Sequence, residues 1–131
     1  MNLNHVTVPC DDLEASIAFY RKLGLRLIVV DPPRYARFEC PAGDATFSLH
    51  RVDHAPNGNG VVVYFEVEDL DGRVRVLGAA GVVFESSPHD QPWLWREAYL
   101  SDPAGNRLCL YDAGKNRRNP PWRLPDDREP V

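Results

Sequence analysis

The 131-residue sequence has no apolar run long enough to cross a bilayer, which takes about 20 consecutive apolar residues. Its start, MNLNHVTVPC, lacks the basic segment and apolar core of a secretory signal. Cysteine is scarce, with three residues, an odd number, and no Cys-x-x-Cys pair. Such a set does not make a disulfide framework. We therefore expect a protein of the reducing cytoplasm, with no membrane partner.

Basic side chains are few in most of the chain. Residues 1–112 carry 10 basic and 16 acidic side chains, a net charge of −6, whereas residues 113–125 carry four basic side chains and no acid. An acidic body is a poor electrostatic match for a phosphate backbone, so nucleic acid is not an expected partner. A hydrophobic content of 44% and a charged content of 26% are those of an ordinary globular protein, and the length favours one domain.

What the sequence does contain is an internal repeat. A strand-like HVTVPC precedes DDLEASIAFYRKLG, and a strand-like VVVYFEV precedes EDLDGRVRVLGAAG. In both helical segments an aspartate can cap the amino end, apolar residues recur at helical spacing, and a glycine follows the carboxyl end. Five positions recur at a displacement of 57 residues: Asp12, Leu13, Ile17, Tyr20 and Gly24 return as Asp69, Leu70, Val74, Leu77 and Gly81.

The repeat continues into the second part of each half. Pro-Ala-Gly occurs twice, 62 residues apart, so about five residues were inserted before the second copy, in the loop-like SSPHDQPWLW. Alternating patterns on either side of each Pro-Ala-Gly predict four strands, at 34–40, 45–51, 94–101 and 107–111. Each half therefore reads strand, helix, strand, strand, strand. The expected organisation is a module at 1–54, a second module at 60–112 and a Pro/Arg-rich extension at 113–131.

These patterns predict an α+β fold of two tandem βαβββ modules. Each module has a sheet with a helix on one face, and the two uncovered faces form a cupped mixed sheet, whose hollow is a natural ligand site. The chain resembles the vicinal oxygen chelate superfamily, which contains glyoxalases, bleomycin-resistance proteins and extradiol dioxygenases. HVTVPCDDLEASIAFYRKLGL, YFEVEDLD and DPAGNRLCLYD carry the resemblance, which spans residues 3 to about 112 and implies the glyoxalase-like fold.

The resemblance implies two kinds of function, because this fold hosts many chemistries. One is metal-dependent lyase, isomerase or dioxygenase chemistry on a small oxygen-bearing metabolite, with one divalent ion such as zinc, iron, nickel or manganese. The alternative is metal-free binding of a small ligand, as in bleomycin-resistance proteins. The resemblance also implies a homodimer.

Four positions of the family hold the metal, one on the first and one on the last strand of each module. His5 occupies the first of them, but its counterpart in the second module is Val62, which cannot bind a metal. The two carboxylate positions hold Ser48 and Cys109. His50 lies two residues beyond Ser48 and hence on the same face of its strand. His5 and His50 are therefore the candidate metal ligands.

Several other residues are candidates for the concave face. Cys109 is either a third ligand beside the two histidines or a small apolar core residue. Strand alternation places Tyr64 and Glu66 on the same face as Val62, so Tyr64 is a candidate for ligand binding. Cys109, at a family metal position, is a second candidate for ligand binding. Glu66 and Glu97 are the candidate general bases. Glu66 could equally be solvated, and the inserted loop leaves the direction of Glu97 open.

The remaining candidates are aromatic. Trp93 and Trp95 alternate, so they point to one side and form either the wall of a site for an apolar or planar ligand or a loop or dimer contact. The prolines at 120–121 exclude a helix or central strand in the extension. We expect this basic segment to lie ordered against the acidic body of its own or a partner subunit, with Trp122 buried as an apolar anchor.

Overall fold

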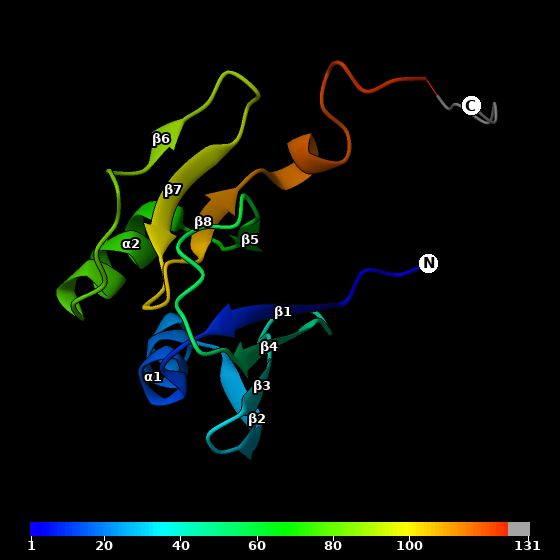
Figure 1. Ribbon diagram of the computed structural model, residues 1–131. Coiled ribbons are helices and arrows are strands. Elements are labelled where there is room, and N and C mark those ends of the chain that lie inside the picture. The colour runs from blue at the N-terminus through cyan, green and yellow to red at the C-terminus, as the bar shows by residue number, and fades with distance from the viewer. Residues whose placement is uncertain (126–131) are drawn as a thin grey trace.

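The computed structural model of the protein describes residues 1–125, which fold into two successive βαβββ units (Figure 1). The first unit contains β1 (His5–Cys10), α1 (Leu13–Leu23), β2 (Arg26–Asp31), β3 (Tyr35–Glu39) and β4 (Thr46–Arg51). The second contains β5 (Val62–Glu66), α2 (Leu70–Ala79), β6 (His89–Asp90), β7 (Arg96–Ser101) and β8 (Arg107–Asp112), followed by a short 3-10 turn, η1 (Gly114–Arg117). The predicted α+β fold is confirmed.

The two units have the same sheet topology. The strand orders are β1-β4-β3-β2 and β5-β8-β7-β6, and in each sheet the first and last strands of the unit pair in parallel while the other pairs are antiparallel. His5 pairs with Thr46, and Val62 pairs with Arg107. His5 and Val62 thus begin equivalent strands, as the displacement of 57 residues predicts.

Both helices begin as the capping pattern predicts. Asp12 accepts a hydrogen bond from the backbone N–H of Ala15, and Asp69 accepts one from that of Gly72. Gly24 ends α1 with φ of 106°, in the left-handed region that a residue without a Cβ enters at little cost. The repeated Asp positions therefore mark the start of both helices, whereas only α1 ends directly at its glycine: α2 is capped by Ala80, and Gly81, with φ of 97°, follows it.

The inserted segment at 86–95 differs from the prediction, which made it a loop without a strand. It contains the two-residue strand β6, which pairs with β7. The predicted strand at 94–101 begins only at Arg96 because Leu94 has φ of 67° and closes a turn, with its N–H donated to the carbonyl of Gln91.

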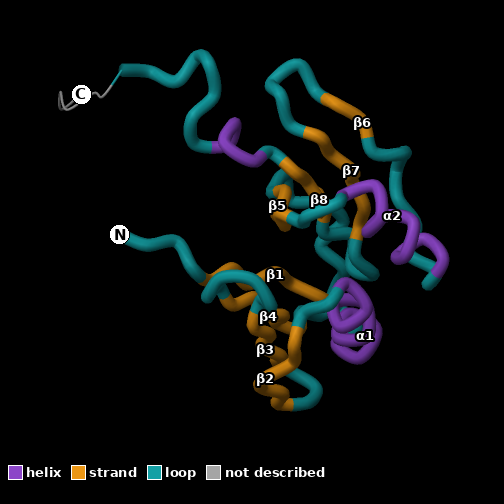
Figure 2. Tube along the Cα trace, turned by 180° about the vertical axis from the view of Figure 1, so that it is seen from behind, coloured by secondary structure: helices purple, strands orange, loops and turns teal. Residues whose placement is uncertain are grey.

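One hydrophobic core joins the two units. Helix-facing residues of both sheets pack with α1 and α2 in a single cluster, and the rings of Phe47 and Phe65 meet across the units at 5.7 Å. Alternation along each strand leaves the opposite face of each sheet without a covering helix. Figures 1 and 2 show both helices on one side of the molecule and both chain ends on the other. We call the uncovered surfaces the first and second open faces.

The turn DPAGN, before β8, also links the units. The carboxylate of Asp102 accepts hydrogen bonds from the backbone N–H groups of Ala104 and Asn106, from the Asn106 amide, and from the Tyr20 hydroxyl of α1 at 2.6 Å. The Asn106 amide also donates to the carbonyl of Pro9 in β1. This buried turn of the second unit is therefore hydrogen-bonded to both α1 and β1 of the first unit.

Candidate functional site

His5 lies on the first open face within a group of hydroxyls. Its Nδ1 is 2.6 Å from the Thr46 hydroxyl, and its Nε2 is 3.1 Å from the Ser48 hydroxyl and 3.3 Å from that of Thr7. The Thr7 and Ser48 oxygens are themselves 2.6 Å apart. These contacts fix the imidazole against β4, so both of its nitrogens already have polar partners within the protein.

His50 lies on the same face but far along the strand from His5. The parallel register sets His5 opposite Thr46 and His50 opposite Pro9, an offset of four residues. Four residues of strand span about 13 Å, whereas a zinc–histidine bond is about 2 Å long. The structure does not bring the two imidazoles together around one ion.

The other family metal positions supply no better donor set. Val62 has no donor, and Ser48 is fully buried beneath His5 and Thr7. Burial, and secondarily the charge of Glu97, raise the pKa of the Cys109 thiol to about 12, so it stays protonated rather than forming the thiolate that binds metals. Among residues 1–125, no group of three or more His, Cys, Asp or Glu side chains could hold a metal ion. The residues present do not fit the metal that the resemblance implies.

The second open face is aromatic. The ring of Tyr64 meets those of Trp95, Tyr99 and Tyr111 edge to face, with centroids 5.9, 6.4 and 5.6 Å away. Trp95 stacks on Tyr111 at 4.8 Å with an interplanar angle of 21°. Tyr64 remains 42% exposed, so this cluster presents a ring to solvent. Cys109 lies fully buried beneath it, in a small cluster separate from the main core.

Glu97 is the buried carboxylate of this face. Ala98 and Leu100 take the helix side of β7, which turns Glu97 towards the open face, where it is 1% exposed. Its Oε2 accepts a hydrogen bond from the Trp93 indole at 3.0 Å, while its Oε1 has no hydrogen-bond partner among residues 1–125. Glu66 stands exposed at the end of β5, opposite Tyr111 in the register. The two carboxylates thus occupy different environments.

The extension meets the body close to its start. The Trp95 indole donates to the carbonyl of Asn116 at 3.2 Å, and Ala113 is buried with Cys109. Trp122 is 56% exposed, so it is not buried against its own body as an anchor. Within residues 1–125, the extension contacts the body through η1 rather than through Trp122.

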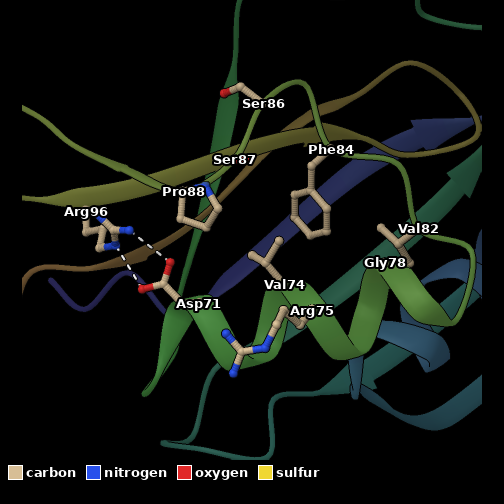
Figure 3. Close-up of a pocket in the computed structure, with 10 residues that line it drawn as sticks. All are labelled: Asp71, Val74, Arg75, Gly78, Val82, Phe84, Ser86, Ser87, Pro88 and Arg96. Carbon is tan, nitrogen blue, oxygen red and sulfur yellow. Dashed lines mark hydrogen bonds and ion pairs between the residues drawn. The ribbon is translucent and has the colours of Figure 1, made fainter.

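A hollow of about 610 Å³ lies away from these faces, between α2 and the segment 82–88 (Figure 3). Arg96 borders it and donates to Asp71 at 2.9 and 3.0 Å and to Asp90 at 3.1 Å. These bonds hold the pKa of Asp71 below its ordinary value of 3.8 and connect α2 to β7. The hollow contains none of the sequence-predicted site residues.

Sequence reasoning missed Tyr35 and Arg37, which face the same side of the first sheet as Ser48. The Arg37 Nε donates to the Tyr35 hydroxyl at 2.8 Å. Hydrogen bonding to Ser48, and then to Arg37, lowers the pKa of the Tyr35 phenol. Strand alternation over 34–40 would have placed both side chains on this face, but no motif draws attention to them.

The comparisons with known proteins agree with this fold. The model of the Glyoxalase/Bleomycin resistance protein/Dioxygenase superfamily matches residues 2–110, so the chain belongs to that superfamily. A glyoxalase/bleomycin resistance protein/dioxygenase from Nocardioides is 28% identical, with a TM-score of 0.77, over 95% of this chain and 90% of its own.

Two further structures share the fold at lower identity. Lactoylglutathione lyase from Agrobacterium tumefaciens is 23% identical, with a TM-score of 0.70, over 85% of this chain and 92% of its own. A bleomycin-binding protein complexed with bleomycin is 22% identical, with a TM-score of 0.68, over 86% and 98%. Among curated proteins, no sequence matches this chain. In the described part of the chain, no helix is both long and apolar enough to span a membrane.

Proposed function

We propose that this protein binds a small planar molecule on its second open face and needs no resident metal ion to do so. Of the two functions that the resemblance implies, this is the binding function. The observation that carries it is the exposed ring of Tyr64 above the stacked pair of Trp95 and Tyr111. A planar ligand can extend this arrangement by stacking or by an edge-to-face contact, each worth about 0.5–1.5 kcal/mol beyond the area it buries.

A polar anchor lies beside the aromatic surface. The buried Glu97 keeps one oxygen without a partner among the described residues, and the Trp93 indole orients the other. Because this oxygen is buried, a ligand N–H or O–H reaches it only when a neighbouring side chain moves aside; the contact would then satisfy a buried acceptor, whose isolation costs about 1–3 kcal/mol. The face therefore offers both apolar area and one directional polar contact, the usual composition of a small-molecule site.

The donor set supports binding without a metal. Both nitrogens of His5 lie against hydroxyls, His50 is four residues away along the sheet, and Cys109 is a buried thiol. Among residues 1–125, none of the three belongs to a group of three or more His, Cys, Asp or Glu side chains that could hold an ion.

One observation favours catalysis as a second candidate. Thr46 and Ser48 fix the ring of His5 on an open face, and a fixed imidazole is suited to move a proton to or from a small oxygen-bearing metabolite. Lyase, isomerase or dioxygenase activity would then involve His5 directly, with Glu66 or Glu97 as a second proton carrier.

A nuclear magnetic resonance titration tests the binding function. The chain has three tryptophans and hence three indole N–H signals. Quinoline serves as a planar probe and cyclohexanol as a nonplanar control. We expect quinoline to shift the signals of Trp93 and Trp95 but not that of Trp122, and Tyr64→Leu to weaken its binding about 2–10-fold. The matched control Trp122→Phe, also at an exposed aromatic residue, should bind quinoline like the wild type. Equal shifts at all three signals, or wild-type affinity in Tyr64→Leu, would refute the proposal.

Metal analysis tests whether the protein carries a resident metal ion. The binding function predicts that protein purified without a histidine tag carries less than one equivalent of divalent metal. One equivalent that is lost in His5→Ala but kept in the exposed-histidine control His54→Ala would refute binding without a metal and support metal-dependent chemistry at His5.

We also propose that the protein works as a homodimer in the cytoplasm. The edge strand β2 exposes Ile28, Val29 and Val30, and an apolar sheet edge of this kind is usually covered by another chain. The free state of all three cysteines suits a reducing compartment. Sedimentation of the wild type against Val30→Lys tests the dimer, since a charge at this edge should shift it towards monomer.

A further inference from the structure

Arg37 lies at the centre of the first open face. The register places Thr7 beside Ser48 and Ser48 beside Arg37, with Val29 on the far side of Arg37. The side chain is half-buried, and its guanidinium lies 5.4 Å from the centroid of the Tyr35 ring. Its Nε is engaged by the Tyr35 hydroxyl, whereas no hydrogen bond to its two Nη groups occurs within residues 1–125.

The two arginines near Arg37 already have acidic partners. Arg26 pairs with Glu39 at 3.1 Å, and Arg34 pairs with Asp31 at 3.2 Å. Among the described residues, no carboxylate lies within ion-pair distance of Arg37 itself. Within residues 1–125, Arg37 is therefore a cation of the first open face without a carboxylate partner, although residues 1–112 are acidic overall.

Neutral donors surround this charge. Ser48 is fully buried, and its hydroxyl contacts that of Thr7 at 2.6 Å and the imidazole of His5 at 3.1 Å, while the Tyr35 hydroxyl accepts from the Arg37 Nε–H. Hydroxyl groups can rotate: when Thr7 accepts the single O–H of Ser48 and Tyr35 accepts from the Arg37 Nε–H, both can donate their own O–H bonds to a ligand. The arrangement of a guanidinium among hydroxyls on an accessible sheet face is that of an oxyanion site.

We propose that the first open face binds the carboxylate of a small molecule, with Arg37 as its charged partner and the hydroxyls of Thr7 and Tyr35 as neutral donors. The inference goes beyond the proposed function, because none of these residues lies on the second open face. The two Nη groups of Arg37 present parallel N–H bonds that match the two oxygens of a carboxylate. A dianionic phosphate would bring a second negative charge, whereas Arg26 and Arg34 near Arg37 are already paired with acids.

Nuclear magnetic resonance titration with benzoate tests the inference. Benzamide serves as the neutral match of the same shape, and phenyl phosphate as the dianionic one. Benzoate is raised to about 20 mM at constant ionic strength, because so small a ligand binds weakly. We expect saturable shifts of the Arg37 side-chain Nε–H signal and of the backbone amides of Thr7 and Ser48. Benzamide should leave these three signals in place.

Two variants and a matched control isolate the charge. Arg37→Gln should weaken benzoate binding about tenfold or more, since a hydrogen bond to a charged group is lost. Arg37→Lys, which keeps the charge but loses the fork, should bind with intermediate affinity. Arg26→Gln removes a neighbouring arginine that already has an acidic partner, and its affinity for benzoate should stay within about twofold of the wild type. A dispersed spectrum in each variant shows that it is folded.

Each remaining outcome overturns the inference. Unmoved Arg37 signals, equal binding of benzamide, or wild-type affinity in Arg37→Gln would remove Arg37 as a carboxylate partner. Tighter binding of phenyl phosphate would replace the carboxylate by a phosphate. Failure here is distinguishable from failure of the proposed function, because that function is read from the indole signals of Trp93 and Trp95 with the neutral probe quinoline.

Discussion

Removal of the Tyr20 hydroxyl should weaken the contact between α1 and the DPAGN turn, which links the two units. The ring of Tyr20 is fully buried, and its O–H donates to the Asp102 carboxylate at 2.6 Å. A hydrogen bond to a charged group contributes about 1.5–3 kcal/mol. In Tyr20→Phe the other donors to Asp102 remain, so no buried charge is left without partners. We expect a loss of about 2 kcal/mol in the free energy of unfolding, or roughly 6–10 °C in Tm for a chain of this length.

Urea denaturation followed by circular dichroism measures this loss. Tyr111→Phe is the matched control, because Tyr111 is also buried while its hydroxyl makes no side-chain hydrogen bond within the described residues. The control should lose less than about 0.5 kcal/mol. If Tyr20→Phe unfolds at the same urea concentration as the control, the bond to Asp102 does not stabilise the contact between α1 and the turn and the reasoning is refuted. A changed m-value would show that the units now unfold separately.

Three further predictions concern the rest of the molecule. Truncation after Asp112 should lower Tm by a few degrees or shift the dimer towards monomer in sedimentation; unchanged melting and sedimentation would make the extension passive. Arg96→Gln should destabilise the protein above about pH 4, and the difference from wild type should vanish as the pH falls through the lowered pKa of Asp71, below 3.8; a difference that persists at pH 2 would contradict this. In native protein at pH 8, iodoacetamide should modify the half-buried Cys40 before the buried Cys109, whose pKa is raised to about 12; mass spectrometry showing the reverse order would contradict the burial of Cys109.

Much of the fold could be predicted because its signals are local. An aspartate such as Asp12 caps a helix through a bond to a residue three positions on, and Gly24 ends the same helix through its own φ. Repetition of both signals at one displacement then identified the second unit. The turn at Leu94 could not be predicted, since a left-handed leucine depends on the surrounding hairpin rather than on its own preference.

The candidate site was harder to predict because it depends on register. Alternation correctly put His5 and His50 on one face, but it carries no information about the offset of four residues between them. The direction of Glu97 required the length of the inserted loop, which the sequence shows only approximately. Arg37 belongs to no motif, and only the structure shows that, within residues 1–125, the neighbouring acids Glu39 and Asp31 pair with Arg26 and Arg34 and not with Arg37.

The equivalence of His5 and Val62 has a consequence for how a ligand is oriented. A hollow built from two identical modules would offer every ligand two head-to-tail orientations of equal energy. Here His5 and Ser48 of the first unit correspond to Val62 and Cys109 of the second. The first open face therefore has hydroxyls and an imidazole where the second open face is apolar and aromatic. The divergence of the two copies removes that degeneracy, and an unsymmetrical molecule lying across both faces would have one orientation of lowest energy.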